Sequence, residues 1–555
     1  MLQTLPPTAI RHTDPGAIAE SPAAGPNEPT MTDASSAAVT MTADQSEVFT
    51  LLGDRRTHAV LFPVTRIDTH SAVVFLAGLD VYKVKRAVRF SFMDLSTLAK
   101  RKAACEAEVA VNRRYAPEIY HGAVPITRAP GGIAIAGPGE PVEWAVHMRR
   151  FDETRTLDHV AERGELGTVL VTRLADALVE VYRDAEIRDG AAATRALRGV
   201  VEETLASLAD ARTFFPPLET ERLAAAMMSA FDRLTPLLLD RGAKGRVRRC
   251  HGDLHLRNIT LLNGVPTPFD AIEFDESIAS IDVLYDLAFL LMDLWERDLP
   301  AQANLVLNRY LWKTTDPELE LEGLAALPLL MSLRAAVRAK VEALRLVELG
   351  EGADQAGEAR RYFAVAAALL AEARPSLIAI GGISGSGKSS VAAHIAARVG
   401  RAPGAVHLRS DIERKRLCGV DERSRLPPGA YGQATTERVY AALRDQAARA
   451  LGAGQCVVVD AVHHRPDERT AIADVAAGLG IPFAGIWLET SYDVAADRVS
   501  ARRSDASDAT PAVVARQAAE PTGHISWTRV DASGHFEDVA GTVQSAVARL
   551  LAGFA

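Results

Sequence analysis

Three polar residues in one short stretch have the types and spacing that phosphoryl transfer needs. Residues 251–258 read HGDLHLRN, and residues 268–270 read PFD. Phosphoryl transfer requires little covalent help from a protein, so its site must mainly position the acceptor hydroxyl and hold Mg²⁺ against the phosphates of ATP. Asp253 is placed to accept the hydroxyl proton, and Asn258 and Asp270 offer oxygen ligands to the hard metal ion. The spacing therefore predicts a catalytic site that uses ATP and Mg²⁺.

A glycine-rich loop much later in the chain offers a second phosphate site. Residues 382–389 read GISGSGKS, follow the apolar run 377–380 and open a helical stretch. This is the strand, loop and helix context that the pattern GxxxxGK[ST] requires. Main-chain N–H groups would wrap the phosphates at the helix N-terminus, Lys388 would reach the β- and γ-phosphates, and Ser389 would bind Mg²⁺. The nucleotide-binding residues predicted here are Gly382, Ser384, Gly385, Ser386, Gly387, Lys388, Ser389 and Ser390.

Carboxylates and an arginine follow the next two predicted strands. Asp411 and Arg414, in the sequence DIER, come after the strand predicted at 406–410. The carboxylate would activate an acceptor hydroxyl, and the arginine would hold an anionic group of the acceptor. The alternative is a helix cap with a surface arginine. Asp460 ends the run 456–459 and is placed to hold Mg²⁺ through water.

The loop at 251–258 resembles the catalytic loop of the aminoglycoside phosphotransferase branch of the protein-kinase-like fold, which commonly has the pattern HGDxxxxN. Residue 255 is His, where protein kinases usually have Lys. This difference favours a small-molecule acceptor over a protein. The glycine-rich loop GxGxxG of protein kinases is absent ahead of residues 71–85.

The resemblance implies further nucleotide contacts in the preceding part of the chain. Residues 71–77 and 80–85 predict a β-hairpin, and Lys83 and Lys85 share one face of its second strand because side chains alternate. We expect Lys83 to reach the ATP phosphates, with Lys85 as the alternative. Glu108, on a helix predicted from about 95 to 115, would orient this lysine, and the main chain near Met148 would face the adenine.

Two acidic residues after the catalytic loop are assigned different positions. Glu273 is expected to be a surface carboxylate, with an extra metal or acceptor contact as the alternative. Asp286 resembles the family's aspartate that braces the catalytic loop by hydrogen bonds. Asn263 and Gly264 predict a turn between strands at about 258–262 and 267–270, which would bring Asn258 and Asp270 to one metal.

Residues 374–555 resemble the small P-loop kinases, a group that includes gluconate-kinase-like, zeta-toxin-like and polynucleotide-kinase-like proteins. After the apolar strand that begins at Ile486, the chain has Arg498 and Arg502 at i, i+4 spacing, so both guanidinium groups can face one site. The resemblance implies that they are lid arginines that neutralise transition-state charge. An exposed arginine pair is the alternative.

The elements that position these residues require more than one core. The 555 residues suggest at least three compact units at ~100 to 200 residues per domain. Residues 1–45 predict a disordered tail without a secretory signal. We expect one domain at 46–370, with helices at about 166–189, 190–212, 218–240 and 318–372, and a second at 374–555, with the boundary at Pro375.

Composition restricts the partners and the compartment. The net charge of −9 argues against a nucleic-acid partner, which rewards a basic surface. The widely spaced cysteines, without CxxC, argue against a disulfide framework or a zinc site and fit a reducing cytoplasm. The apolar segment 283–295 is too short for a membrane span and contains Asp286 and Asp293. Oligomeric state is left open.

We therefore expect a chain of mixed α/β and α+β class, with a two-lobed protein-kinase-like domain followed by a P-loop domain whose parallel sheet is flanked by helices. The expected function is ATP- and Mg²⁺-dependent phosphoryl transfer to small-molecule hydroxyl groups at two separate nucleotide sites. One alternative is a nucleic-acid end kinase in the P-loop domain. Another is an ATP-binding regulatory protein with a non-catalytic first domain, which the missing GxGxxG loop permits.

Overall fold

The computed structural model describes residues 40–89, 93–501 and 506–553. Residues 41–555 form one compact unit. Most of the tail expected at 1–45 lies outside the described residues. Residues 40–45 are described, and among them Gln45 is buried and its side chain donates a hydrogen bond to the Lys85 carbonyl at 2.9 Å. The folded unit therefore begins before residue 46.

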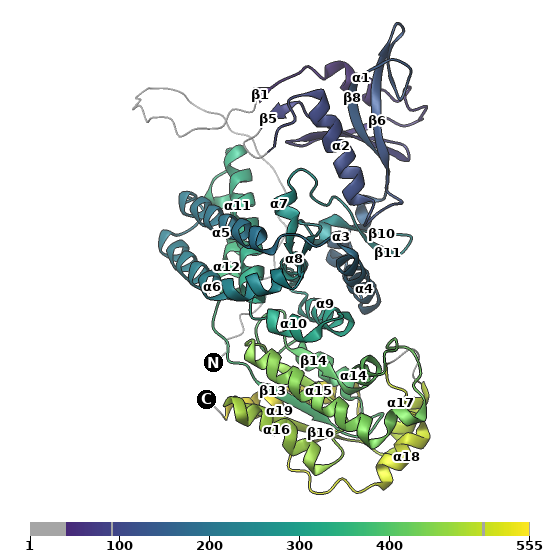
Figure 1. Cartoon of the computed structure of the whole chain (residues 1–555), viewed down its shortest axis with the longest axis vertical. Coiled ribbons are helices and arrows are strands. Elements are labelled where there is room, and N and C mark those ends of the chain that lie inside the picture. The colour runs from purple at the N-terminus through teal and green to yellow at the C-terminus, as the bar shows by residue number, and fades with distance from the viewer. Residues whose placement is uncertain (1–39, 90–92, 502–505, 554–555) are drawn as a thin grey trace, which may run out of the picture. The chain divides into compact units, whose positions relative to one another are not determined.

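The N-terminal lobe is built on a six-stranded antiparallel sheet with the order β2-β3-β4-β8-β6-β7. The predicted hairpin is confirmed: β3 pairs with β4, and the turn contains Gly78 at a φ of 64°. Helix α2 packs against β8 and β6 of this sheet (Figure 1). The elements are β1 (Thr40–Met41), α1 (Ser46–Gly53), β2 (Thr65–Asp68), β3 (Ala72–Ala77), β4 (Asp80–Lys85), β5 (Val88–Arg89), α2 (Leu98–Asn112), β6 (Tyr120–Ala129), β7 (Gly132–Ile135) and β8 (Glu140–Arg149).

The second lobe is mainly helical, with short hairpins that carry the catalytic loop. Its centre is α8, which is almost entirely buried and begins where the Asp282 side chain accepts a hydrogen bond from the Leu284 N–H. The elements are η1 (Glu153–Arg155), α3 (Leu157–Glu162), α4 (Thr168–Asp184), α5 (Gly190–Asp210), α6 (Pro217–Ala243), β9 (Val247–Arg249), η2 (Leu256–Asn258), β10 (Ile259–Leu262), β11 (Val265–Pro268), α7 (Glu276–Ala279), β12 (Ser280–Asp282), α8 (Val283–Glu296), α9 (Pro300–Lys313), α10 (Pro317–Gly323), α11 (Leu327–Glu348), η3 (Ala353–Gln355) and α12 (Gly357–Leu369).

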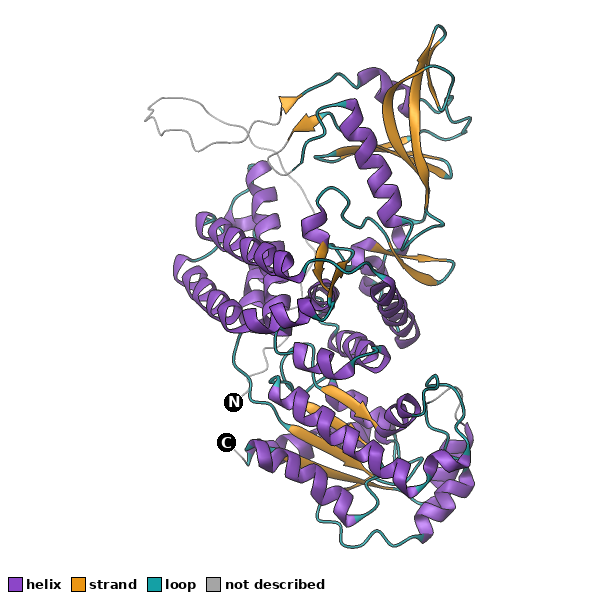
Figure 2. Cartoon of the chain, viewed as in Figure 1, coloured by secondary structure: helices purple, strands orange, loops and turns teal. Residues whose placement is uncertain are grey.

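The C-terminal part is a five-stranded parallel sheet with the order β14-β15-β13-β16-β17, flanked by helices (Figure 2). This arrangement confirms the fold class expected for residues 374–555. Its elements are β13 (Leu377–Gly381), α13 (Lys388–Ala396), β14 (Val406–Arg409), α14 (Ser410–Leu417), η4 (Pro428–Tyr431), α15 (Gln433–Gly452), β15 (Val457–Asp460), α16 (Pro466–Leu479), β16 (Phe483–Glu489), α17 (Tyr492–Ala501), α18 (Pro511–Ala519), β17 (Thr528–Asp531) and α19 (Phe536–Ala552). We call residues 46–370 the first module and residues 374–555 the second module.

Helix α9 of the first module covers β14, the edge strand of the second. Asn304, Asn308 and Trp312 are each four residues apart on α9, so they share one face. Asn304 and Asn308 donate to the Ala405 carbonyl at 2.9 and 3.1 Å. Asn308 also accepts from the His407 N–H at 2.6 Å, and Trp312 donates to the His407 carbonyl at 2.7 Å. Four helical residues rise about 6 Å and two strand residues about 6.6 Å, so helix and strand remain in register.

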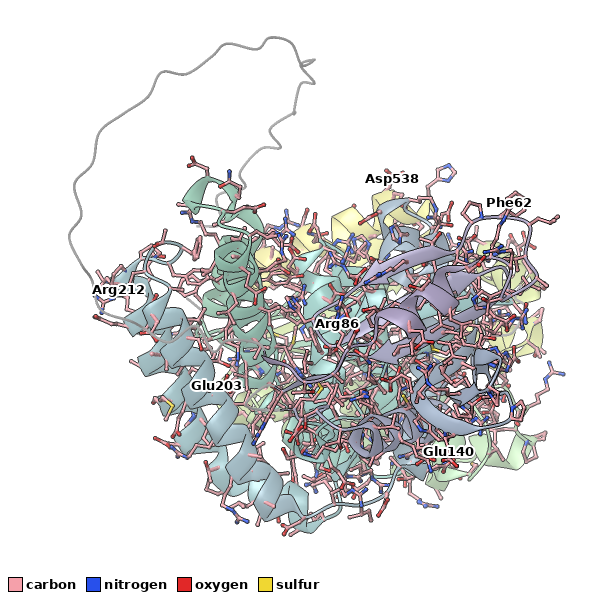
Figure 3. The ribbon with its side chains drawn as sticks, turned by 90° about the horizontal axis from the view of Figure 1, so that it is seen from above. Phe62, Arg86, Glu140, Glu203, Arg212 and Asp538 are labelled. Atoms are coloured by element: carbon pink, nitrogen blue, oxygen red, sulfur yellow. The ribbon has the colours of Figure 1, made fainter. Side chains whose placement is uncertain are left out.

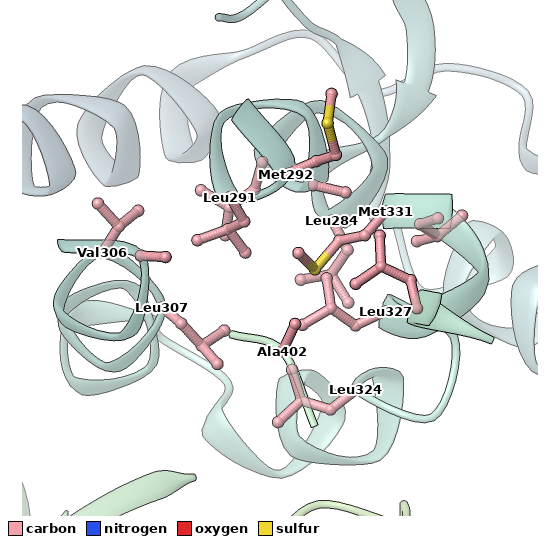
Figure 4. Close-up of a cluster of buried hydrophobic side chains, with 14 of the residues drawn as sticks. Leu284, Leu291, Met292, Val306, Leu307, Leu324, Leu327, Met331 and Ala402 are labelled. Carbon is pink, nitrogen blue, oxygen red and sulfur yellow. The ribbon is translucent and has the colours of Figure 1, made fainter. Parts of the chain in front are cut away.

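The hydrophobic core is also continuous between the modules. One cluster of buried side chains contains Leu284, Leu307 and Leu327 of the first module together with Ala402 and Val406 of the second. Figure 4 shows Ala402 among leucines of the first module. Because these side chains pack in one core, we expect the two modules to depend on each other for stability.

The outer surface carries many charged side chains, among them Glu203, Arg212 and Asp538 (Figure 3). Among the described helices, none combines the length and the apolar character that crossing a membrane requires.

Truncating Leu327 to Ala tests the continuous core. Leu327 is fully buried, so removing its side chain should lower the free energy of unfolding by about 2–5 kcal/mol. The control is Leu349→Ala, because Leu349 is 58% exposed and its loss should change stability by less than about 0.5 kcal/mol. Denaturant unfolding monitors both variants. Equal, small effects would contradict a core at this position.

Candidate active sites

The loop at residues 251–258 of the first module holds Asp253 and Asn258 together. The Asn258 amide donates to the Asp253 carboxylate at 2.9 Å and to the Asp253 carbonyl at 3.0 Å. As expected, Asp286 braces the loop, since it accepts from the Gly252 N–H at 2.8 Å. Asp293 accepts from the Leu256 N–H at 2.8 Å. Helix α8 supplies both bracing carboxylates, so the burial of this helix fixes the loop.

Lys83 joins the sheet of the N-terminal lobe to the end of the β10–β11 hairpin. Its ammonium group lies 2.9 Å from the Glu108 carboxylate on α2 and 2.9 Å from the Asp270 carboxylate after β11. Asp270 has a φ of 58°, and its N–H donates to the Tyr120 hydroxyl at 3.1 Å. The structure thus brings together the three residues that the sequence places up to 187 positions apart.

Lys85 and Glu273 form a second pair beside this one. The Lys85 ammonium group lies 2.5 Å from Glu108 and 2.5 Å from Glu273, and the Glu273 side chain is only 8% exposed. The expectation that Glu273 is a surface carboxylate is therefore wrong. The alternative to Lys83 as the ATP lysine, Lys85, is more deeply buried, at 4% exposure against 18%. Sequence reasoning recognised the shared face of both lysines but missed the partner of Lys85.

The charges around these groups set their protonation. Burial alone would raise the pKa of Asp253, but the hydrogen bond and charge of His255, with the charges of His251 and Arg334, hold it below its usual range. Burial likewise opposes ionisation of Glu108, yet Lys83 and Lys85 lower its pKa to about 2. Both carboxylates are therefore ionised at neutral pH.

The residues around Asp270 fit a magnesium ion bound to ATP. The Asn258 side-chain nitrogen donates to Asp253, so the side-chain oxygen of Asn258 can bind a cation. The Asp270 carboxylate is 46% exposed. Oxygen donors of this kind suit Mg²⁺, which keeps several waters and substrate oxygens in its shell. Within the described ranges no cluster of three or more His, Cys, Asp or Glu forms a metal cage.

Met148 is the penultimate residue of β8, where the chain leaves the N-terminal lobe.

The glycine-rich loop of the second module has the predicted strand, loop and helix form. It links β13 to α13, and Gly382, Gly385 and Gly387 have φ values of 139°, 87° and 89°. A Cβ atom on Gly385 would lie 2.3 Å from the Ala495 carbonyl oxygen, so only glycine fits there. The Lys388 ammonium group donates to the Ile383 carbonyl at 2.9 Å. The Ser386 hydroxyl is buried without a hydrogen-bond partner among the described residues, as expected for a loop that wraps a ligand.

Asp460 ends β15 beside basic groups that the sequence did not point to. His407 lies 3.7 Å and Arg409 3.6 Å from its carboxylate. Burial would raise the pKa of Asp460, but the nearby His407 imidazole and the charges of Arg409 and Lys388 keep it below its ordinary value. The carboxylate is thus ionised next to the P-loop lysine. The sequence pattern that could have indicated these neighbours is the alternation of side chains along a strand, which places His407 and Arg409 on one face of β14.

Asp411 and Arg414 line one cavity with the P-loop. This cavity has a volume of about 740 Å³, and Ser384 forms part of its wall. The Arg414 guanidinium donates to the Ala430 carbonyl at 3.0 Å and lies 5.0 Å from the Tyr431 ring centroid. Burial raises the pKa of Asp411, and the charge of Arg409 opposes this effect.

Further polar side chains around this cavity were missed by sequence reasoning. Gln517 accepts a hydrogen bond from the Ser384 N–H at 2.8 Å, across 133 residues of sequence. The other basic lining residues are Arg425, His464, Arg465 and Arg516. No local pattern marks them, because three separate parts of the chain contribute them.

Of the two predicted lid arginines, the structure describes Arg498. Arg498, on α17, donates to the Ala532 carbonyl at 2.8 Å and to the Gly534 carbonyl at 3.2 Å. It lies beside the P-loop, since a Cβ atom on Gly387 would be 3.9 Å from its guanidinium group. Arg502 lies outside the described residues.

Known proteins resemble this chain over most of its length or over single modules. A family model described as an AAA domain matches residues 377–522. The uncharacterized proteins Rv2004c of Mycobacterium tuberculosis and Mb2027c of Mycobacterium bovis are each 31% identical over 487 residues, covering 85% of this chain and 93% of the relative.

Two solved structures are distant likenesses. A choline/ethanolamine kinase family protein from Mesorhizobium loti is 14% identical, covers 56% of this chain and 97% of its own, and has a TM-score of 0.33. A gluconokinase from Sinorhizobium meliloti 1021 is 23% identical, covers 32% of this chain and 95% of its own, and has a TM-score of 0.25.

Separate nucleotide sites predict a simple stoichiometry. Asp270→Ala removes a proposed metal ligand in the first module, and Lys388→Ala removes the proposed phosphate cation in the second. Calorimetric titration of Mg²⁺ and a non-hydrolysable ATP analogue into the full chain should give about two sites for the parent and one for each variant. Linkage between the sites would shift affinities by about 1–3 kcal/mol without changing these counts. A single site in the parent that Lys388→Ala abolishes would contradict a nucleotide site in the first module.

Proposed function

We propose that this chain, which belongs to the same family as Rv2004c of Mycobacterium tuberculosis and Mb2027c of Mycobacterium bovis, is an ATP-dependent phosphotransferase that acts on small-molecule hydroxyl groups in each of its two modules. One observation carries the proposal: in each module a carboxylate lies beside a residue that could help to hold Mg·ATP, Asp253 beside Asn258 in the first and Asp411 in one cavity with Ser384 in the second. Bound Mg·ATP would supply the γ-phosphoryl group and the charge neutralisation that its transfer requires.

In the first module, the contacts support distinct roles for the polar residues. Lys83, held by Glu108, would contact the ATP phosphates, and Asn258 and Asp270 would hold Mg²⁺. Asp253 is ionised and would accept the proton of the acceptor hydroxyl as the oxygen attacks phosphorus. The Asn258 amide keeps the Asp253 carboxylate oriented.

In the second module, the shared cavity supports transfer between the P-loop and Asp411. Lys388 and the glycine-rich main chain would bind the phosphates, with Ser389 and Asp460 near Mg²⁺. Asp411 would take the proton from a hydroxyl group in the 740 Å³ cavity. Arg498 would contribute positive charge beside Gly387, and Arg502 is proposed only from its spacing.

Two arginines in the cavity wall favour an anionic acceptor for the second module. Among the described residues, no carboxylate lies within ion-pair distance of Arg414 or Arg425, although both line the cavity. An arginine without a carboxylate partner is ready for a carboxylate, sulfate or phosphate of the substrate. A sugar acid or sugar phosphate therefore fits better than its neutral counterpart.

A screen of phosphoryl transfer tests the proposal. The full chain, Lys388→Ala and Asp270→Ala would be incubated with γ-labelled ATP and matched pairs of neutral and acidic hydroxyl compounds. Acidic compounds should be labelled by Asp270→Ala but not by Lys388→Ala. Labelling of 5′-hydroxyl oligonucleotides in preference to every metabolite would instead favour a nucleic-acid end kinase in the second module.

Replacing Asp253 with Asn tests the proton acceptor of the first module. The variant retains size and hydrogen bonding but lacks a base, so first-site phosphotransfer should fall about 10²- to 10⁴-fold while nucleotide affinity persists. Both quantities are measured in the Lys388→Ala background. The matched control is Asp298→Asn, at an exposed turn with a φ of 60° that Asn also adopts. Unchanged turnover in Asp253→Asn would make the first module an ATP-binding domain without this catalysis.

The two catalytic carboxylates predict different responses to acid. A base works in its ionised form, so a lowered pKa keeps Asp253 active into more acidic solution, whereas a raised pKa makes Asp411 lose its charge earlier. The acidic limb of kcat/KM should therefore lie at higher pH for the second site than for the first. Profiles recorded in Asp270→Ala and Lys388→Ala isolate the two sites. Coincident limbs, or the reverse order, would contradict these base assignments.

A further inference from the structure

A line of charged contacts runs from the first module to the acceptor cavity of the second. It begins at Arg309 on α9. The Arg309 guanidinium binds the Asp176 carboxylate of α4 through Nε at 2.6 Å and Nη2 at 2.9 Å. The same group binds the Glu422 carboxylate of the second module through Nη1 and Nη2, both at 2.5 Å.

The contacts continue from Glu422 to the cavity wall. The Lys415 ammonium donates to the Glu422 carbonyl at 2.7 Å and lies 3.2 Å from the Asp508 carboxylate. Asp508 accepts from the Leu426 N–H at 3.0 Å and from the Tyr431 hydroxyl at 2.8 Å. Leu426, Tyr431 and Asp508 all line the cavity, and the Tyr431 ring lies under Arg414.

The members of this line are too buried to be an incidental surface network. The side chains of Arg309, Glu422, Lys415 and Asp508 are 7%, 12%, 2% and 11% exposed. A buried charge is costly unless it is paired and hydrogen-bonded, so each group restricts the position of the next. Only an arginine has the planar fork of donors that can bind two carboxylates at once in this geometry.

From these contacts we infer that Arg309 of the first module is a positioning residue for the acceptor site of the second. It holds Glu422 and thereby the loop 421–431, which forms one wall of the acceptor cavity. The inference rests on the proposed function of that cavity. It means that the first module completes the acceptor site of the second, while the P-loop itself is built without it.

Two conservative substitutions in the full chain test the role. Arg309→Lys keeps the charge and loses the fork, and Glu422→Gln keeps the shape and loses the charge. A second ion pair between the modules provides matched controls: Arg449 of α15 contacts Glu322 and Glu318 of α10 and has no link to the loop 421–431. The controls are Arg449→Lys and Glu322→Gln.

The first readout is kinetic. In the Asp270→Ala background, with an acidic acceptor found in the screen, Arg309→Lys and Glu422→Gln should raise the acceptor KM on the order of tenfold with little change in kcat or in ATP affinity, as expected for lost ground-state positioning. The double variant should be no worse than the more affected single variant, because both residues act through one contact. Equal KM values for test and control variants would overturn the inference.

The second readout needs no acceptor and therefore separates this inference from the proposed function. Arg423 and Arg425 are exposed trypsin sites in the loop 421–431. Cleavage after these residues should be faster in Arg309→Lys and Glu422→Gln than in the parent and the controls, at unchanged melting temperature. If no acceptor is turned over but the loop is released, the proposed function fails and the positioning role stands. Equal cleavage rates, or a fall in melting temperature that matches the gain in cleavage, would overturn it.

Discussion

The edge strand β14 imposes the constraint on which much of this structure depends. An edge strand has main-chain groups without strand partners, and such groups must be covered or left to water. Here Asn304, Asn308 and Trp312 of α9 satisfy the polar groups at Ala405 and His407. The covered strand leads directly into Arg409 and Asp411, so the helix that closes the sheet edge also fixes the position of the proposed base. Packing of leucines around Ala402 extends this cover into one continuous core.

Within this shared core, the two proposed sites solve the same electrostatic problem differently. In the first module, a buried glutamate, Glu108, is shared by two lysines, and the charges keep it ionised despite its burial. In the second, the main chain of a glycine-rich loop and one lysine would bind the phosphates, and Asp460 is kept ionised beside His407 and Arg409. The first site would thus rely on side-chain ion pairs between the lobes, and the second on main-chain N–H groups of one loop.

The sequence could predict what depends on neighbours along the chain. The P-loop, the loop at 251–258 and the hairpin that contains Lys83 are encoded in short patterns, and the structure has them where the patterns lie. Long-range contacts were out of reach. The Lys85–Glu273 pair joins residues 188 positions apart, and Glu273 was therefore mistaken for a surface carboxylate. The i, i+4 spacing of Arg498 and Arg502 predicts a shared helix face. It does not reveal that the Arg498 guanidinium group donates to the carbonyls of Ala532 and Gly534. The cover of β14 by α9 likewise follows from packing, since each segment alone has an ordinary pattern.

We propose that one folded unit contains two nucleotide sites with separate catalytic groups. A crystal structure of the full chain with Mg²⁺ and a non-hydrolysable ATP analogue is the decisive test. It should contain two bound nucleotides: one with its phosphates at Lys83 and its metal at Asn258 and Asp270, the other in the loop 382–389 with its γ-phosphate facing Asp411. A single nucleotide on the P-loop, with Lys83 still paired to Asp270 under saturating analogue, would rule out a nucleotide site in the first module.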